Sequence, residues 1–582
     1  MTTAGQSRPG LSRALLSISI GIALGSVLVS LYAFTRRVPD GLISDRLATA
    51  TRFTAGSLIA AAVVATVLAG AAVTAWLGRL GAGKAATLLC LLCVVAAWCY
   101  LSTNPPTWTV AISGSDGRPV VALVQAAWLL LTVSAVFLVA GVVAAPENRQ
   151  PFKWPAVLPF AAIGVALSLV AGYGLATLAR VGASHPTTAV PIAIPDFPRT
   201  LGTKTAYTVP AESIDTLVPA GPGFVLADDD AVVAYDGTTG AERWRFPLTA
   251  FPDDCLFRQL RSTGSAPNAV VFAECDRSGG YDKPRRDSYL VGLDAMTGTV
   301  LWRLDTDWSL RGRVLLPADV VPVVNGKMNA LGSLDPRTGS LRWTRSLDSL
   351  GQNCATTGSV TMAVDRTIIY WLPCQTFVKV LFFDAASGIE RTAEHPVPQE
   401  LTRDAALTPV ASDGNVAIIE ARSKLSIHSL YLRADERTGN VSDVPVPRFH
   451  SDVSHIGQYP GPVLQFSETG DLSGSSELYR LDDGSIRHLN GLKDFSSSIL
   501  SGPHSGQFWA EVGDQMVTAA ASDDNSDLLA SVSRDGSYMR RSSPCGSDIG
   551  AVVSAPGAVL VICTRTKGGG TLGYDILGMT PG

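Results

Sequence analysis

The first 180 residues and the rest of the chain differ in how apolar and polar positions are arranged. Before residue 180 there are five runs of 17 to 26 residues that contain no Asp, Glu, Lys or Arg. These runs are 14–34, 56–77, 85–101, 120–144 and 154–179. About 20 apolar residues span the hydrocarbon core of a bilayer as a helix. The pattern therefore predicts an α-helical membrane domain of five transmembrane helices in residues 1–180.

The segment that follows, 181–203, predicts an extended linker because it is rich in proline and small residues. The first apolar run follows Arg8 and Arg13, as the apolar part of a signal peptide would. This run is long, and no small-x-small cleavage site ends it, so we expect it to remain as a membrane anchor.

From residue 204 to residue 582, short strand-like segments alternate with a recurring turn. The turn contains an Asp, a Gly four residues later and a Trp eight residues after the Asp. The complete copies are Asp236, Gly240 and Trp244, then Asp294, Gly298 and Trp302, then Asp335, Gly339 and Trp343. Weaker copies follow at Asp384, Asp435, Asp482, Asp535 and Asp575. The Asp residues recur every 40 to 58 residues, and a hairpin repeated at such an interval is typical of an all-β propeller with one blade per copy.

Each residue of the repeat has a predicted structural role. The Asp side chain accepts hydrogen bonds from backbone N–H groups of the turn, and the Gly takes the positive φ that the turn requires. The Trp packs against the neighbouring blade. The last copy supplies three strands, and segment 205–209 is expected to complete that sheet so that no edge is exposed. This arrangement gives eight blades, with seven as the alternative.

The D-x-x-T-G-x-x-x-W pattern of the three complete copies resembles the repeat of pyrroloquinoline-quinone (PQQ) type propellers. That family includes quinoprotein dehydrogenases and the propeller lipoprotein of the bacterial outer-membrane β-barrel assembly machine. The resemblance covers about 205–575, and in the later copies Thr392 and Asp443 occupy the Trp position. Low Lys usage with high Arg, Ala and Gly usage indicates a GC-rich bacterial genome. We therefore expect a membrane-anchored bacterial, and specifically actinobacterial, protein.

Six cysteines of the second part form three pairs with similar spacing. The pairs are Cys255 and Cys275, Cys354 and Cys374, and Cys545 and Cys563, with separations of 20, 20 and 18 residues. A strand, a turn and a returning strand would bring each pair to a distance that permits a disulfide. Disulfides persist outside the cytosol, so we expect the propeller to be extracytoplasmic.

The expected topology follows from this location. An odd number of spans places the N-terminus in the cytoplasm of a multi-pass plasma-membrane protein. Basic residues give no independent support, because the inner and outer segments would each carry six.

Composition and motifs point away from several classes of function. A formal net charge of −4 gives no indication of nucleic-acid binding, and 16% charged residues with a mean hydropathy of +0.24 are typical of a membrane protein. The sequence contains no GxSxG, HExxH or GxxxxGK motif. We therefore expect no catalytic or metal-binding residues and no cofactor. The predicted function is a non-catalytic interaction module of the cell envelope, with the lipid bilayer and an envelope protein as partners.

Two alternatives remain open. Membrane-bound glucose dehydrogenases of the quinoprotein class also carry five spans before an exported eight-bladed propeller, and that family uses calcium, an Asp base and long loops around PQQ. The present propeller averages about 46 residues per blade, which leaves little loop length for a cofactor pocket. The second alternative is a sensor for an envelope glycan or another ligand.

Overall fold

The computed structural model describes four helical segments and most of the second part of the chain. The described ranges are 9–35, 45–76, 119–143, 154–182, 186–211, 216–227, 231–252, 255–277, 288–312, 316–317, 319–348, 354–355, 358–398, 405–423, 429–444, 463–467, 476–481, 484–489, 509–521, 527–546, 549–567 and 570–580. The chain forms two compact units, and after the helices the chain passes from the first unit to the second between Ser184 and His185.

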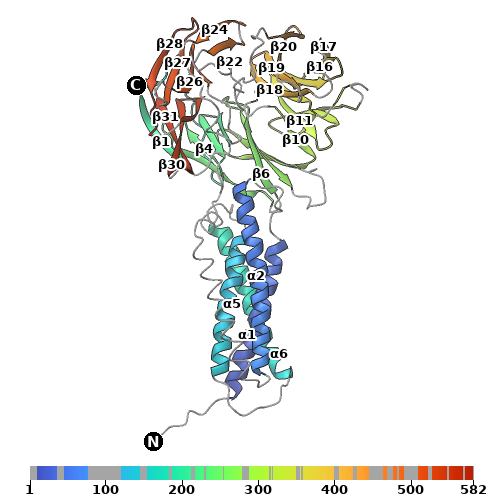
Figure 1. Ribbon diagram of the computed structural model, residues 1–582, viewed down its shortest axis with the longest axis vertical. Coiled ribbons are helices and arrows are strands. Elements are labelled where there is room, and N and C mark those ends of the chain that lie inside the picture. Colours follow the sequence, from blue (N-terminus) through green and yellow to red (C-terminus); the bar gives the residue numbers. More distant parts are fainter. Residues whose placement is uncertain are drawn as a thin grey trace. The chain divides into compact units, whose positions relative to one another are not determined.

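The first unit contains long apolar helices that pack side by side. They are α1 (Pro9–Thr35), α2 (Asp45–Trp76), α5 (Pro119–Val143) and α6 (Trp154–Gly182), and α1 contacts the other three (Figure 1). Small residues allow the close approach of α1 and α6, because a Cβ on Gly21 would collide with the backbone of Ala161. Serine hydroxyls link α1 and α5, where Ser19 Oγ donates to the carbonyl of Ser134 at 2.9 Å.

Two helical stretches of this unit are long and apolar enough to cross a bilayer, as judged by length and composition. They are Leu11–Phe34 and Gly56–Val73. The apolar stretches Ala126–Val142 of α5 and Leu158–Gly174 of α6 are shorter. The run predicted at 85–101 lies outside the described residues. The described residues thus contain two candidate spans, where the sequence pattern predicts five.

In the second unit, the described strands form eight antiparallel sheets. The first sheet contains β2 (Thr216–Ala220), β3 (Gly223–Ala227), β4 (Ala231–Asp236) and β5 (Glu242–Pro247); the second contains β6 (Cys255–Ser262), β7 (Val270–Arg277), β8 (Ser288–Asp294) and β9 (Val300–Thr306). The third contains β10 (Trp308–Leu310), β11 (Val321–Asn325), β12 (Ala330–Leu334) and β13 (Leu341–Ser346); the fourth contains β14 (Val360–Val364), β15 (Thr367–Pro373), β16 (Phe377–Asp384) and β17 (Glu390–Pro396). The fifth contains β18 (Ala405–Asp413), β19 (Val416–Ser423), β20 (Ser429–Asp435) and β21 (Asn440–Asp443); the sixth contains β22 (Val463–Ser467), β23 (Ser476–Arg480) and β24 (Ile486–Leu489). The seventh contains β25 (Trp509–Val512), β26 (Gln515–Ala521), β27 (Asp527–Val532) and β28 (Tyr538–Ser542). The eighth contains β29 (Ile549–Ala555), β30 (Ala558–Lys567), β31 (Gly570–Thr580) and β1 (Lys204–Ala211).

The core of this unit lies between successive sheets. One cluster of buried side chains joins the third and fourth sheets, another the fourth and fifth, and another the seventh and eighth. A further cluster joins the eighth sheet to the first, where β29 contacts β2. Sheets packed in chain order, with the last against the first, form an all-β propeller-like domain (Figure 1).

The eighth sheet is completed by the strand that comes first in the chain. Strand β1 pairs antiparallel with β31, from Lys204 opposite Thr580 to Ala211 opposite Tyr574. The expected closing strand at 205–209 is therefore present, and it covers an edge of β31 that would otherwise be exposed.

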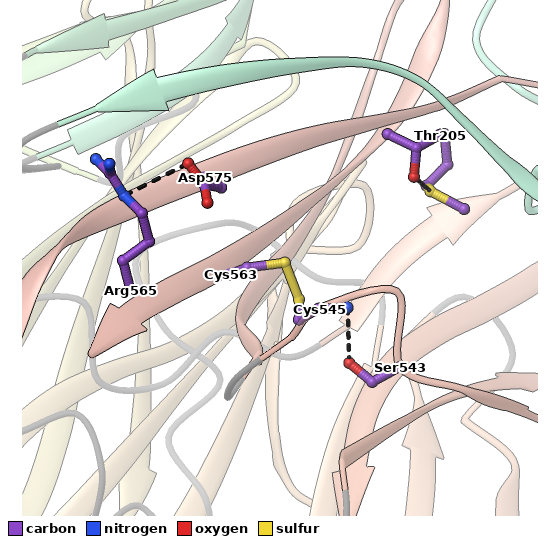
Figure 2. The surroundings of a disulfide bond; sticks show 7 residues. Thr205, Ser543, Cys545, Cys563, Arg565 and Asp575 are labelled. Atoms are coloured by element: carbon purple, nitrogen blue, oxygen red, sulfur yellow. Dashed lines mark hydrogen bonds and ion pairs between the residues drawn. A yellow bond between two sulfur atoms is a disulfide. The ribbon is translucent and has the colours of Figure 1, made fainter. Parts of the chain in front are cut away.

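The turn predicted at Asp575 is wrong for the same reason. Asp575 lies within β31, opposite Cys563 of β30, and its carboxylate is 3.4 Å from Arg565 Nε (Figure 2). Since the fourth strand of this sheet comes from the other end of the chain, no turn has to follow the third strand.

The segment expected as a linker is hydrogen-bonded to the second unit. Thr187 forms a bridge with Arg245 of β5, and the N–H of Ala189 donates to the carbonyl of Thr297 at 2.9 Å. Farther along, the carbonyl of Asp196 accepts from the N–H of Gly557 at 3.0 Å. Residues 187–196 are therefore extended, as expected, but they belong to the propeller-like unit.

Each described disulfide joins the segment before the first strand of a hairpin to the second strand of that hairpin, or to the residue directly after it. Cys354, just before β14, is bonded to Cys374, just after β15 of the same sheet. Cys545 is bonded to Cys563 of β30, with Cα atoms 5.5 Å apart (Figure 2). Cys275 is also disulfide-bonded, and the side chain of its expected partner, Cys255, lies outside the described residues.

We expect replacement of both Cys354 and Cys374 by Ala to lower the free energy of unfolding by about 3 kcal/mol without loss of the fold, because the bond closes a loop of about 20 residues. Denaturant titration of the full-length protein, with circular dichroism as the control for folding, measures this change. Peptide mapping without reductant should show only bonds within a sheet, and a bond between sheets would contradict the assignment.

Candidate functional site

The Asp residues of the repeat cap the turns between the third and fourth strands of the sheets. Asp236 Oδ1 accepts hydrogen bonds from the N–H groups of Thr238 and Thr239 at 3.0 and 2.9 Å. The same backbone pattern occurs in the next four sheets, at Asp294, Asp335, Asp384 and Asp435. In the sixth sheet the corresponding turn begins at Arg480, two residues before Asp482, because the N–H of Gly484 donates to the carbonyl of Arg480.

The Gly of the repeat is required by the backbone and by the neighbouring sheet. Gly240, Gly298 and Gly339 have φ values of +68°, +72° and +70°, which favour glycine. A Cβ on Gly298 would lie 2.6 Å from Trp244 Cγ, and a Cβ on Gly339 would lie 2.6 Å from Trp302 Cδ2. Gly298 and Gly339 therefore make room for the Trp of the preceding sheet, and Gly240 makes room for Tyr207 of β1.

Each Trp of the repeat also donates a hydrogen bond to the next sheet, which the sequence analysis did not predict. Trp244 Nε1 donates to the carbonyl of Ala295 at 3.1 Å, and Trp302 Nε1 to that of Pro336 at 2.8 Å. Trp343 Nε1 donates to the carbonyl of Ala385 at 3.0 Å. In every case the acceptor directly follows the turn Asp of the next sheet. We call this donor–carbonyl bond the turn contact.

Other side chains make the turn contact where Trp is absent. Tyr207 of β1 donates from its hydroxyl to the carbonyl of Gly237 at 2.8 Å, which joins the eighth sheet to the first. Arg391 of β17 donates from Nη2 to the carbonyl of Glu436 at 2.7 Å, which joins the fourth sheet to the fifth. The turn contact therefore does not depend on an aromatic ring.

The assignment of Thr392 and Asp443 to the Trp position is wrong by one residue. In the second and third sheets a β-bulge precedes the Trp, so that Trp302 pairs with Gly292 and Trp343 with Ser333. The fourth sheet pairs without a bulge between β16 and β17, which places Arg391 opposite Phe382. A bulge adds one residue to one strand, so its absence shortens the Asp-to-donor spacing by one.

A second group of functional candidates lies on β6 and β7 of the second sheet, and its members range from exposed (Arg258) to buried (Arg261 and Glu274). We call Arg258, Gln259, Arg261, Glu274 and Asp276 the charge cluster. The Glu274 side chain is fully buried and accepts a hydrogen bond from Gln259 Nε2. Arg258 Nη1 lies 3.8 Å from Glu274 Oε1 and 3.3 Å from Asp276 Oδ1. Burial raises the pKa of the Glu274 carboxyl, and the bond from Gln259 and the nearby arginines offset part of this effect.

Arg261 connects the charge cluster to the third sheet. Its Nη1 donates to the carbonyls of Arg311, at 3.1 Å, and Gly312, and its Nη2 donates to Gln259 Oε1 at 2.7 Å. Burial lowers the pKa of the Arg261 guanidinium to about 10, although Glu274 acts in the opposite direction. The sequence analysis missed the charge cluster because its residues occur in a single copy of the repeat and carry no motif.

The charge cluster can form hydrogen bonds and ion pairs. Within the ranges that the structure describes, no three His, Cys, Asp or Glu side chains form a group that would hold a metal ion. Buried ionisable groups with displaced pKa values are typical of functional sites as well as of structural ion pairs.

Comparison with known proteins gives one match to a family model. Residues 228–457 match the model described as outer membrane protein assembly factor BamB. No curated protein matches the sequence.

Several solved propellers are similar in fold. The WD40 domain of SCAP from fission yeast is 10% identical, with a TM-score of 0.37, and the match covers 64% of this chain and 98% of that one. The Dos1 propeller is 15% identical, with a TM-score of 0.38, and the match covers 65% and 95%. The propeller domain of the trilobed protease from Pyrococcus furiosus is 15% identical, with a TM-score of 0.31 and coverage of 58% and 98%.

We expect Gly339→Ala to destabilise the protein more than Gly414→Ala. Both glycines have positive φ, so each substitution costs about 1–2 kcal/mol in backbone energy. Only at Gly339 does the added Cβ meet Trp302, whereas nothing lies within 4 Å at Gly414, which adds about 1–3 kcal/mol of overpacking. Denaturant unfolding followed by tryptophan fluorescence measures both variants. Equal losses would contradict the role of the turn contact.

We expect Glu274→Gln to change how stability depends on pH. The pKa of the Glu274 carboxyl is higher in the folded protein than in the unfolded chain. Protonation of Glu274 therefore stabilises the folded protein below the unfolded pKa, and this stabilisation is lost as the pH rises through the folded pKa. Glutamine does not titrate, so the free energy of unfolding of the variant, relative to the parent protein, should rise over this window. The matched control is Glu394→Gln, an exposed position on β17, and a difference that does not vary with pH would refute the assignment.

Proposed function

We propose that this protein is a membrane-tethered, eight-bladed propeller that acts as a non-catalytic interaction module in a bacterial cell envelope. The observation that carries the proposal is the series of turn contacts. In the described residues they connect five successive junctions, from the eighth sheet through the first to the fifth. Turns that are capped by Asp and bonded to the preceding sheet present a rigid surface, which lowers the entropic cost of binding a partner.

The proposed location combines the helices with the disulfides. Two helical stretches suit a bilayer by length and composition, and the sequence pattern supplies three further spans. Disulfides favour an extracytoplasmic propeller, and with five spans the N-terminus is then cytoplasmic. The lipid bilayer is one partner in this proposal, and an envelope protein is the other.

The turns between the third and fourth strands of the third, fourth and fifth sheets are the best candidate for a docking surface. First and third strands of a sheet run parallel, so the turns that follow them lie at the same edge. Segment 187–199 approaches these turns at Thr297, Gly557 and Gly513 of the second, eighth and seventh sheets. Among the described residues it makes no hydrogen bond to the turns of the third, fourth and fifth sheets. Ile389, beside the fourth turn, is 68% exposed.

A photoreactive amino acid at position 389 tests the proposal in the full-length protein in its native membrane. The matched control is position 328, because Met328 is also an exposed apolar residue but lies between β11 and β12, at the opposite edge of its sheet. We expect a discrete crosslinked protein from position 389 and none from 328. Protease added to intact spheroplasts should destroy that product, because the propeller is outside.

Equal crosslinking from both positions would contradict the proposed docking surface, and protection from protease would contradict the topology.

The purified protein supplied with PQQ and calcium is expected to show no dye reduction with sugars or alcohols. In the described turns the repeating Asp carboxylates already accept backbone hydrogen bonds. PQQ-dependent turnover would replace this proposal with the dehydrogenase.

A further inference from the structure

Arg311 follows β10 of the third sheet, and its backbone is held in place by the charge cluster. Arg261 donates hydrogen bonds to the carbonyls of Arg311 and Gly312, and the N–H of Arg311 donates to the carbonyl of Pro322 at 2.8 Å. Gly312 has a φ of +87°, a conformation that favours glycine. The backbone from which the Arg311 side chain projects is therefore rigid.

The guanidinium of Arg311 lacks a counter-ion among the described residues. Its Nε is buried without a hydrogen-bond partner, and no described carboxylate forms an ion pair with it. By contrast, Arg258 is paired with Glu274 and Asp276, and Arg342 of the same sheet is paired with Asp335 at 3.0 Å. A buried charge without a partner is costly, so the site would gain from a bound anion.

The charges around Arg311 favour an anion as the missing partner. Arg311 interacts electrostatically with Arg258, Glu274 and Asp276 of the second sheet. With Arg261, which bonds to the Arg311 carbonyl, this group holds three arginines (Arg258, Arg261 and Arg311) and two carboxylates. The group as a whole therefore carries a surplus of positive charge.

A polar residue of the fourth sheet also belongs to the electrostatic surroundings of Arg311. Tyr370 of β15 interacts electrostatically with Arg311, and its hydroxyl donates to Ser359 Oγ at 2.8 Å. Hydroxyl groups next to a guanidinium are common partners of carboxylate and phosphate oxygens. Three sheets thus contribute groups to one place.

We propose that the guanidinium of Arg311 binds a small oxyanion, a phosphate or a carboxylate, where groups of the second, third and fourth sheets come together. The planar guanidinium suits two oxygens of such an anion. Arg261 acts as a positioning residue, since it holds the backbone of Arg311 and Gly312. This site is separate from the docking surface around Ile389, so the two proposals fail or succeed independently.

The test uses the purified full-length protein in detergent and two probes, inorganic phosphate and acetate, at matched ionic strength. We expect the melting temperature to rise with at least one probe and to saturate, because a ligand that binds only the folded state stabilises it by mass action. The probe that acts at the lower concentration identifies the kind of oxyanion.

Variants at two arginines connect the effect to the site. Arg311→Gln should weaken binding at least tenfold, and Arg311→Lys, which keeps the positive charge, should weaken it less. Arg303→Gln is the matched control, because Arg303 is exposed on β9 and carries the same charge, and it should leave binding within twofold of the parent protein. If a variant without ligand has a different melting temperature from the parent protein, isothermal titration calorimetry compares their affinities for the probe directly. No saturable effect of either probe, or equal binding by Arg311→Gln and the parent protein, would overturn the proposal.

Discussion

The propeller-like unit depends on one repeated bond, in which a side chain of one sheet donates to the carbonyl that follows the turn Asp of the next. The bond brings together three elements that are separate in the sequence: a capped turn, a glycine with positive φ and a donor from the preceding sheet. Trp, Tyr and Arg all serve as donors. The carbonyl after the turn Asp thus accepts a hydrogen bond from different kinds of side chain. This explains how the sheets stay in contact where the repeat lacks a Trp.

The same bond connects the two ends of this unit. Tyr207 lies on β1, which pairs with β31 near the other end of the chain, and it donates to the turn of the first sheet. The eighth sheet is thereby joined to the first by the same geometry as the other junctions. Pairing strands from the two ends of a long chain segment has a large cost in conformational entropy. Tyr207 adds a hydrogen bond and the contacts of its ring at the junction between the eighth and first sheets, where this cost is greatest.

The charge cluster differs from the turn contacts in its energetics. A turn contact satisfies a carbonyl without burying a charge, since its one charged donor among the described contacts, Arg391, is exposed. Glu274 and Arg261 are charged groups taken out of water, which is favourable only when hydrogen bonds and opposite charges compensate for the lost solvation. Gln259 lies between them and bonds to both. A buried ion pair is weak evidence for added stability, and the proposed role of its neighbour Arg311 in binding gives the charge cluster a second purpose.

The sequence by itself determined the features that recur with a constant interval or have a long uniform composition. The apolar runs, the strand-rich second part and the turn residues such as Asp294 and Gly298 belong to this class, since local composition and backbone geometry decide them. The closing strand at 205–209 was predicted because the last copy of the repeat leaves its sheet one strand short. Tertiary structure decided what depends on register and on contacts between distant strands. The absence of a β-bulge in the fourth sheet moved the donor from Thr392 to Arg391, strand pairing placed Asp575 inside β31, and hydrogen bonds attached segment 187–196 to the propeller-like unit. The charge cluster could not be predicted, because its residues carry no motif and meet only when β6 and β7 pair, and the segment after β10 joins them only once the sheets pack.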